Sequence, residues 1–363
     1  MRKTIALVLT ALMAGSVTAG CSGNTATASS AAPASPVSEA SQASGAAGSV
    51  KVGVCIYKFD DTFMTGVRNN MSKEAATLGA KLDMVDSQNS QPTQNTQVDT
   101  FITKGVQALA VNPVDATAAA PLIEKAKAKS LPIVFLNREP AEDILKDYDK
   151  VWYVGAPAAQ SGTLSGQLIA KYFKAHPEAD KNKDGKVQYV MLQGEPGHQD
   201  AVLRSKYAPE AIKDGGFEPV CLAKGTAMWD KSKATDLMNN FITSQGLGKI
   251  EAVLANNDDM ALGAIEALKA KGYNKGDQTK YIPVVGVDAT APALEAMKEG
   301  SMLGTVLNDA ENQGKATVNI AVAAAQGKEI NKDNIGYDVT DGKYVWIPYV
   351  QVTQDNYTQY MNK

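Results

Sequence analysis

The chain has 363 residues, of which 44% are hydrophobic and 21% charged, and its formal net charge at pH 7 is −3. This weakly acidic balance, without basic patches, argues against binding to nucleic acid or directly to a membrane surface. The length exceeds what one hydrophobic core usually serves, so two lobes are expected in the folded part.

The N-terminus has the pattern of an export signal. Two basic residues precede a short apolar run at residues 5–13, and small residues then lead to Cys21. This pattern predicts a lipoprotein signal peptide at residues 1–20, with cleavage before Cys21 and a lipid on its thiol. An ordinary secretory signal is the alternative, because Thr18 stands where lipoprotein signals usually have leucine.

Residues 21–50 would follow the signal as a lipidated cysteine and a disordered tether. Apart from one charged residue, Glu39, nearly all are Ser, Ala, Thr, Gly or Pro. Such a segment cannot bury enough apolar surface to fold, and as a flexible coil it would reach roughly 30 Å on average. We therefore expect a globular domain held at the extracytoplasmic face of the cell membrane by a lipid anchor.

From Lys51 to Lys363, strand and helix patterns alternate almost without a break. The first series of predicted strands covers residues 52–56, 81–85, 108–111, 132–136 and 151–154. The second series covers residues 187–192, 218–222, 252–255 and 283–287. Repeated strand–helix units predict parallel sheets with helices on both faces, so two series predict an α/β fold of two doubly wound lobes.

The last third of the chain is predicted to return to the first lobe and then to cross back. It contains a predicted strand at 302–307, a helix at 309–325 and a late strand at 344–352. We expect an N-terminal lobe of residues 51–156 plus 308–346 and a C-terminal lobe of residues 157–307 plus 347–363. Several short crossings would form a hinge in place of a single linker.

Two cysteines remain in the folded part. Cys55 and Cys221 both lie inside predicted strands. We expect buried free thiols in preference to a disulfide.

Residues 180–188, Asp-Lys-Asn-Lys-Asp-Gly-Lys-Val-Gln, have the ligand order of a calcium loop. Oxygen-bearing side chains stand at positions one, three, five and nine, with glycine at position six. Position twelve should be a bidentate glutamate but is Met191, and the residues after the loop form a predicted strand. The closing carboxylate must come from elsewhere, and the combination indicates a structural calcium site in a binding protein in preference to a calcium sensor.

Polar and aromatic residues follow one predicted strand end after another. They are found at 57–63, Asn137, 194–200 with Arg204, 226–230, 256–258, Asp288 and 308–309. Open α/β sheets bind ligands beyond the carboxyl ends of their strands. Planar Asp, Asn and Arg groups match adjacent sugar hydroxyls, and Phe63 and Trp229 offer flat faces to a pyranose ring. No glycine-rich phosphate loop occurs in the sequence.

Each of these residues also has an ordinary structural explanation. An Asp or Asn after a strand usually caps the next helix. Trp229 could be a core aromatic, His198 a surface histidine and Glu251 a solvated charge at the start of a strand. The joint pattern favours a binding site, because the strands themselves are nearly bare of polar groups.

Several segments resemble, in order, the family of periplasmic D-galactose/D-glucose-binding proteins, which are periplasmic binding proteins of type I. They are residues 56–64, 86–89, 194–198, 226–230, 255–258, 286–289 and 305–310. The resemblance runs from about Val52 to the C-terminus and implies two parallel-sheet lobes joined by a multi-segment hinge. It also implies high-affinity binding of D-glucose or D-galactose and delivery to an ABC importer by hinge closure. The lipoprotein signal and tether depart from the secreted version, which implies a membrane-tethered form.

The resemblance assigns roles to matching residues. Phe63 and Trp229 would sandwich the sugar ring. Its oxygens would be hydrogen-bonded by Asp61, Asn137, His198, Asp200, Arg204, Asn257, Asp288 and Asn308. Asp61 would accept from the 4-hydroxyl in either orientation, so both sugars are expected. Calcium would be held by Asp180, Asn182, Asp184, the Lys186 carbonyl, Gln188 and, as the missing bidentate ligand, Glu251.

The resemblance implies a monomeric binding protein whose closed form binds the membrane subunits of an ABC transporter. A chemoreceptor or other sensor that binds the same closed form is the alternative partner. An enzyme acting on sugars is the rival from another class, with Asp61, Asp200 and Asp288 as candidate acids and bases. We expect these aspartates to be charged, with no acid of raised pKa among them. A sugar-responsive transcription regulator would need a helix-turn-helix where residues 1–50 predict a signal and tether.

Overall fold

The computed structural model describes residues 49–361. The predicted signal peptide, Cys21 and nearly all of the predicted tether lie outside the described residues. Within the described part, no helix combines the length and the apolar character needed to cross a bilayer.

The N-terminal lobe is built on a six-stranded parallel sheet with the strand order β11-β5-β4-β3-β1-β2. Its strands are β1 (Lys51–Ile56), β2 (Lys81–Asp86), β3 (Ala108–Val111), β4 (Ile133–Leu136), β5 (Val151–Gly155) and β11 (Tyr344–Trp346). Its helices are α1 (Thr62–Thr77), α2 (Gln91–Thr103), α3 (Ala119–Lys127), α4 (Glu142–Lys146), α10 (Ala310–Ala325) and α11 (Lys332–Ile335). Strands β1, β3 and β4 are nearly bare of polar residues because helices cover both faces of this sheet.

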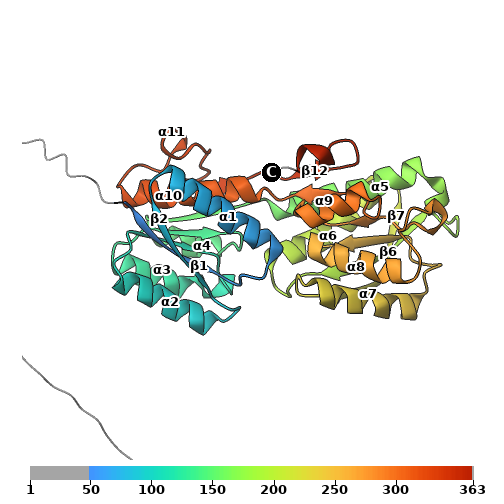
Figure 1. The fold of residues 1–363 in the computed structure, drawn as a ribbon, viewed down its shortest axis with the longest axis horizontal. Helices are drawn as coiled ribbons and strands as arrows, with labels where there is room; N and C mark the ends of the chain where they lie inside the picture. The colour runs from blue at the N-terminus through green and yellow to red at the C-terminus, as the bar shows by residue number, and fades with distance from the viewer. Residues whose placement is uncertain (1–48, 362–363) are drawn as a thin grey trace, which may run out of the picture. The chain divides into compact units, whose positions relative to one another are not determined.

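Helices α1 and α10 cover one face of this sheet, and α2 and α3 cover the other (Figure 1). α10 joins this lobe although it lies more than two hundred residues after α1 in the chain. Gly314 allows the close packing of the two helices, because a Cβ there would lie 2.8 Å from the carbonyl oxygen of Val67. The late helix therefore completes the core of the first lobe.

The C-terminal lobe contains a four-stranded parallel sheet with the order β7-β6-β8-β9. Its strands are β6 (Lys186–Gln193), β7 (Glu218–Thr226), β8 (Ala252–Ala255) and β9 (Val284–Val285). Its helices are α5 (Ala158–Ala175), α6 (Gln199–Asp214), α7 (Lys231–Gln245), α8 (Asp258–Ala270) and α9 (Ala291–Lys298). β10 (Thr305–Leu307) pairs antiparallel with β12 (Val350–Val352). Single bridges join Leu307 of β10 to Asp288, and Gly304, just before β10, to Val285.

The chain passes between the two sheets after β5, after β10 and after β11. The prediction of one late strand at 344–352 is wrong, because β11 belongs to the first sheet and β12 pairs with β10. Pro348 lies between them and has no backbone N–H for a ladder bond, so the strand is interrupted there. Three chain segments thus connect the lobes, which is a hinge arrangement.

The expectation of two buried thiols is correct for one cysteine only. Cys55 lies in the interior strand β1 and is fully buried, and this burial raises the pKa of its thiol to about 12. Cys221 is free but exposed, because β7 is an edge strand of the second sheet. The location of Cys221 in a predicted strand was therefore not enough to predict its burial, because the strand lies at the edge of its sheet.

Candidate binding site

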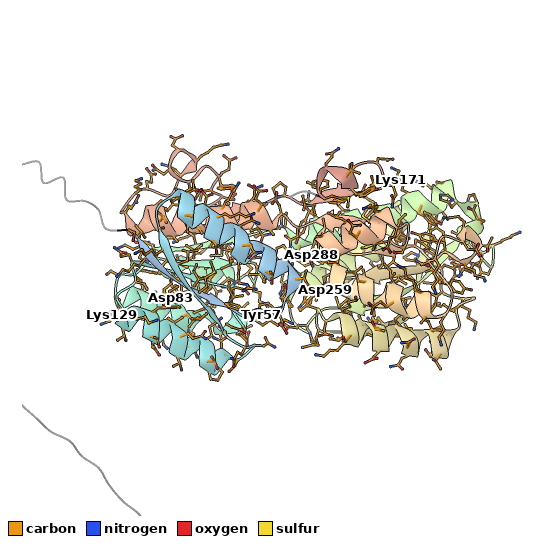
Figure 2. The ribbon with its side chains drawn as sticks, in the orientation of Figure 1. Tyr57, Asp83, Lys129, Lys171, Asp259 and Asp288 are labelled. Carbon is orange, nitrogen blue, oxygen red and sulfur yellow. The ribbon has the colours of Figure 1, made fainter. Side chains whose placement is uncertain are left out.

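A cavity lies where the carboxyl ends of the strands of both lobes meet. It is lined by Tyr57, Asp61, Phe63, Met64, Asn137, Arg138, His198, Arg204, Trp229, Asn257 and Asp288. Eight of the ten residues assigned to ligand binding from the sequence are among them. Figure 2 shows Tyr57 of the first lobe and Asp288 of the second near the junction of the lobes. The cavity volume is only about 30 Å³, so the binding of a ring-sized ligand requires the lobes or side chains to move apart.

Asp61 joins the end of β1 to the start of α1. Its Oδ1 accepts a hydrogen bond from the backbone N–H of Met64 at 2.7 Å, so it is the N-cap of α1. Its Oδ2 accepts from the hydroxyl of Tyr57 at 2.6 Å. Burial, with the nearby Asp61 carboxylate, raises the pKa of Tyr57, which keeps this hydroxyl protonated as a donor. Asp61 is therefore both a cap and a member of the cavity wall.

Asn137 follows β4 with a backbone φ of 64°, in the left-handed region that asparagine tolerates better than most residues. Its Oδ1 accepts from Nδ2 of Asn112 at 3.1 Å, and its carbonyl accepts from the hydroxyl of Tyr153 at 3.0 Å. These contacts hold a strained strand end in place, so the amide is presented to the cavity in one orientation.

Arg204 is the most heavily bonded side chain of the second wall. It is buried in α6 and donates from Nε to Ser161 at 3.0 Å and from Nη1 to the carbonyl of Asn256 at 2.7 Å. Nη2 donates to Oδ2 of Asp200 at 2.6 Å and to the hydroxyl of Tyr349 at 2.8 Å. Asp200 does not itself line the cavity and adjoins it through Arg204.

Trp229 lines the cavity in a strained turn after β7, where Met228 and Trp229 have φ angles of 56° and 62°. Its ring makes an edge contact with His198, with centroids 5.0 Å apart. Gly194 makes room for the indole, because a Cβ there would lie 2.2 Å from the ring. The buried indole Nε1 has no hydrogen-bond partner within the described residues. Trp229 is therefore not a satisfied core aromatic, and its N–H is free to donate to a ligand or a water.

Asn257, Asp288 and Asn308 come from three different strand ends. Asn257 caps α8 by accepting from the N–H of Met260 at 3.0 Å. Asn308 donates from Nδ2 to Oδ1 of Asp288 at 3.3 Å and accepts from Gln313 at 2.5 Å. Asn308 does not line the cavity above; with Phe63 and Asp288 it lines a neighbouring cavity. It reaches the candidate site through Asp288.

The charges of the site differ from the sequence-based expectation. Burial raises the pKa of Asp288 well above its usual value and raises that of Asp200, although Arg204 lowers both. The expectation that no acid has a raised pKa is therefore wrong, because the arginine does not fully offset the loss of water. Burial, followed by Arg138 and Arg204, holds the pKa of His198 well below its usual range, so the imidazole is neutral.

Arg138 and Tyr349 were not assigned to the site from the sequence. The Arg138 guanidinium stacks 3.9 Å from the ring centroid of Tyr57 and donates to the carbonyl of Val114 at 2.7 Å. It also forms an ion pair across the lobes with Glu195, 2.8 Å away. Arg138 directly follows Asn137 at a strand end, so the strand-end pattern could have found it. Tyr349 lies between β11 and β12, and no local signal indicated its contact with Arg204.

A second contact between the lobes involves Thr62 and Asp259. The Thr62 hydroxyl donates to Oδ2 of Asp259 at 2.8 Å. Thr62 begins α1 in the first lobe, and Asp259 lies in the first turn of α8 in the second. Direct side-chain contacts therefore join the two lobes.

The loop at 180–188 lies against Glu251. The Glu251 carboxylate is almost fully buried and accepts from the backbone N–H groups of Lys181 and Gln188 at 2.7 and 3.0 Å. Asp180 accepts from the N–H groups of Asp184 and Gly185. The Oε1 atom of Gln188 is buried and has no hydrogen-bond partner among residues 49–361.

The predicted calcium ligands are thus gathered around one loop. Asn182 donates to Asp184 at 3.1 Å, and Gln188 Nε2 donates to Asp184 at 2.8 Å. Lys186, whose carbonyl was the predicted ligand, is the first residue of β6. Within residues 49–361, no group of three or more His, Cys, Asp or Glu side chains is close enough to hold a metal ion. An ion would therefore depend on amide and carbonyl oxygens and on small movements of the carboxylates.

Comparisons with known proteins point in one direction. Residues 52–329 match the family model of a periplasmic binding protein domain. The chain is 45% identical over 307 residues to the D-galactose/methyl-galactoside binding periplasmic protein MglB of Haemophilus influenzae, covering 84% of this chain and 90% of that protein. It is 33% identical to a putative rhizopine-binding protein of Rhizobium meliloti, with coverages of 86% and 93%.

A solved structure shows the same fold. An ABC transporter solute binding protein from Bacillus halodurans with bound myo-inositol aligns with a TM-score of 0.73 and 34% identity. The alignment covers 88% of this chain and 99% of that protein.

Proposed function

This chain belongs to the periplasmic binding protein family, and on that premise we propose that it captures D-glucose and D-galactose outside the cytoplasm and delivers them to an ABC importer. The observation that carries the proposal is a cavity at the junction of the lobes, to which both lobes contribute planar polar groups and aromatic rings. Carboxylate, amide and guanidinium groups pair with adjacent hydroxyls, while Phe63 and Trp229 offer flat faces to the ring.

Hinge closure supplies the mechanism. The three crossings after β5, β10 and β11 allow the lobes to open and to close over a sugar. Closure would remove the sugar from water and place its hydroxyls against Asp61, Asp288 and Arg204, with Asp200 behind Arg204. A micromolar dissociation constant would correspond to about −8 kcal/mol.

The raised pKa values support selectivity. Burial disfavours the charged form of a carboxylate, and it raises the pKa of Asp288 although Arg204 and the hydrogen bond from Asn308 act in the opposite direction. A sugar hydroxyl that donates to this carboxylate would relieve the cost. A deoxy sugar would leave the acceptor unpaired and should bind more weakly.

A sensory role is the second candidate, because a chemoreceptor could read the same closed form. A sugar-acting enzyme has less support. Asp61 is held by Tyr57 and the α1 backbone, and Asp200 by Arg204. The related proteins named above are described as binding proteins.

Lipid anchoring through Cys21 is the proposed localisation. It would place the folded lobes, proposed as 51–156 plus 308–346 and 157–307 plus 347–363, at the outer face of the membrane. Detergent phase partitioning of the expressed full-length protein tests this. The wild type should enter the detergent phase and Cys21→Ala the aqueous phase, and equal partitioning would contradict the anchor.

Calcium is proposed as a structural ligand of the loop at 180–188. Bound there, it would supply positive charge to cross-link the loop. The unpartnered Gln188 Oε1 and the fixed Glu251 carboxylate support this assignment. Asp180, Asn182, Asp184 and the Lys186 carbonyl would complete the ligand set.

The sugar proposal is tested by a thermal-shift screen of monosaccharides followed by calorimetry. D-glucose and D-galactose should raise the melting temperature and bind with similar affinity. Ribose, mannitol and 2-deoxyglucose serve as comparison ligands and should bind more weakly. A screen in which neither hexose shifts the melting temperature would contradict the proposal.

A further inference from the structure

Asp258 is the first residue of α8 and directly follows the cavity residue Asn257, yet it does not line the cavity. None of its surface is exposed. Its Oδ1 accepts from the hydroxyl of Thr305 at 2.6 Å. Its Oδ2 accepts from the backbone N–H of Thr290 at 2.8 Å and from the Thr290 hydroxyl at 3.3 Å. Its own N–H donates to the carbonyl of Val287 at 2.8 Å.

These bonds do not serve the helix that Asp258 begins. The N-cap of α8 is Asn257, whose side chain accepts from the N–H of Met260. The Asp258 carboxylate instead accepts hydrogen bonds from the loop after β9 and from β10. One buried carboxylate thus connects three segments of the second lobe.

The same three segments carry binding residues. Asp288 lies two residues before Thr290, and Asn308 lies three residues after Thr305. The backbone at Asp288 and Ala289 has positive φ angles of 130° and 56°, which side-chain-bearing residues adopt only when their surroundings impose it. The Asp258 carboxylate anchors the end of this strained segment at Thr290.

Gly286 shows how closely the loop approaches the carboxylate. A Cβ at this position would lie 2.4 Å from Oδ1 of Asp258, so only glycine fits. The loop that carries Asp288 is therefore packed against Asp258 as well as bonded to it.

We propose that Asp258 is a positioning residue for hexose binding, which fixes Asn257, Asp288 and Asn308 relative to one another without touching the sugar. This inference rests on the function proposed above. It assigns a role to a buried carboxylate that is not part of the cavity wall.

The first test removes the negative charge of the Asp258 side chain while keeping its size and shape. Asp258→Asn turns one acceptor oxygen into a donor, so it cannot accept from both threonines. We expect calorimetry to show D-galactose binding weakened by about tenfold or more, because hydrogen bonds to charged groups contribute more than neutral ones. Asp277→Asn is the matched control, since Asp277 accepts from the N–H and hydroxyl of Thr279 at an exposed site. The control should bind like the wild type.

The second test leaves Asp258 in place. Thr305→Val removes the hydroxyl that donates to Oδ1, and Thr305→Ser retains it. Affinity should fall in the valine variant and be restored in the serine variant. Because this pair does not alter the carboxylate, it decides the question if Asp258→Asn does not fold.

A double-mutant cycle with Asp288→Asn separates positioning from general stability. If Asp258 acts through Asp288, adding Asp258→Asn to Asp288→Asn should weaken binding much less than it does in the wild type. Equal losses in both backgrounds, or wild-type affinity in Asp258→Asn, would overturn the inference. Failure of the wild type to bind any hexose would instead overturn the proposed function, and the inference with it.

Discussion

Trp229 presents a large apolar face to the cavity, and its backbone has a positive φ angle that only the surrounding contacts can maintain. The ring makes an edge contact with His198 and fits against Gly194, where a side chain would clash with it. Trp229→Ala should weaken hexose binding at least tenfold, because burial of an aromatic face contributes roughly 2 kcal/mol or more. Isothermal titration calorimetry measures this.

Trp346→Ala is the control for the loss of an indole. Trp346 packs on Tyr344 and Tyr153 and does not line the cavity. This variant should lose stability and keep its sugar affinity. If Trp229→Ala binds as the wild type does, the stacking role is wrong.

His198 gives the molecule a specific response to acid. Its pKa is held below the usual value by burial first and by Arg138 and Arg204 next. As pH falls through about 6.5, His198 takes up a proton in the unfolded chain but stays neutral in the folded chain. The free energy of unfolding therefore decreases below that pH. His198→Asn should remove this loss while keeping the helix cap that His198 provides.

Urea unfolding at about pH 7.5 and about pH 5.5 checks the histidine prediction. The wild type should lose more of its free energy of unfolding than His198→Asn between these values. Parallel losses would show that the imidazole is protonated in the folded protein too.

At the residue level, the sequence indicated which groups follow the strands but not what surrounds them. Asn137 and Trp229 were identifiable because strand ends form ligand sites. The raised pKa of Asp200 could not be predicted, because it depends on how completely the lobes bury it. Tyr349 was missed because its contact with Arg204 joins residues 145 positions apart.

At the level of elements, buried strands were the most predictable. The bounds of β3 and β8 agree with the predicted ranges, since both are continuous apolar runs between polar segments. β9 was predicted at 283–287 but is only Val284–Val285. The chain leaves the strand at Gly286 for the loop that carries Asp288, and side-chain pattern alone does not reveal that turn.

The loop at 180–188 is an element whose stability we expect to depend on calcium. Chelation should lower the melting temperature of the wild type by several degrees, because the proposed oxygen ligands of the loop would lose the cation that joins them. Galactose affinity measured below the transition should be unchanged. The loop precedes β6, whereas the cavity residues follow its other end.

Glu251→Gln and Asp277→Asn provide the comparison for the chelation experiment. The first removes the buried carboxylate at the loop and should abolish most of the chelator effect. The second alters an exposed aspartate elsewhere and should respond as the wild type does. If neither chelator nor added calcium changes the melting temperature of the wild type, the proposed calcium site is wrong.

At the scale of the whole molecule, two side-chain contacts join the lobes. Arg138 pairs with Glu195, and Thr62 bonds to Asp259. Both partners of the ion pair are largely buried, with 6% and 14% of their side chains exposed. Separation of the lobes would break such contacts, so we expect them to favour the closed form and to raise the apparent affinity for a sugar.

Glu195→Gln tests the ion pair between Arg138 and Glu195 without altering the cavity wall, because Glu195 is not among the lining residues. The uncharged amide cannot balance the Arg138 guanidinium, so the closed form should be less populated. We expect hexose affinity to fall by roughly three- to thirtyfold, mainly through faster dissociation measured by stopped-flow fluorescence. Glu299→Gln is the matched control, since its ion pair with Lys269 has the same 2.8 Å separation but lies within one lobe. Equal dissociation rates for the two variants would mean that closure depends on the sugar contacts and the hinge alone.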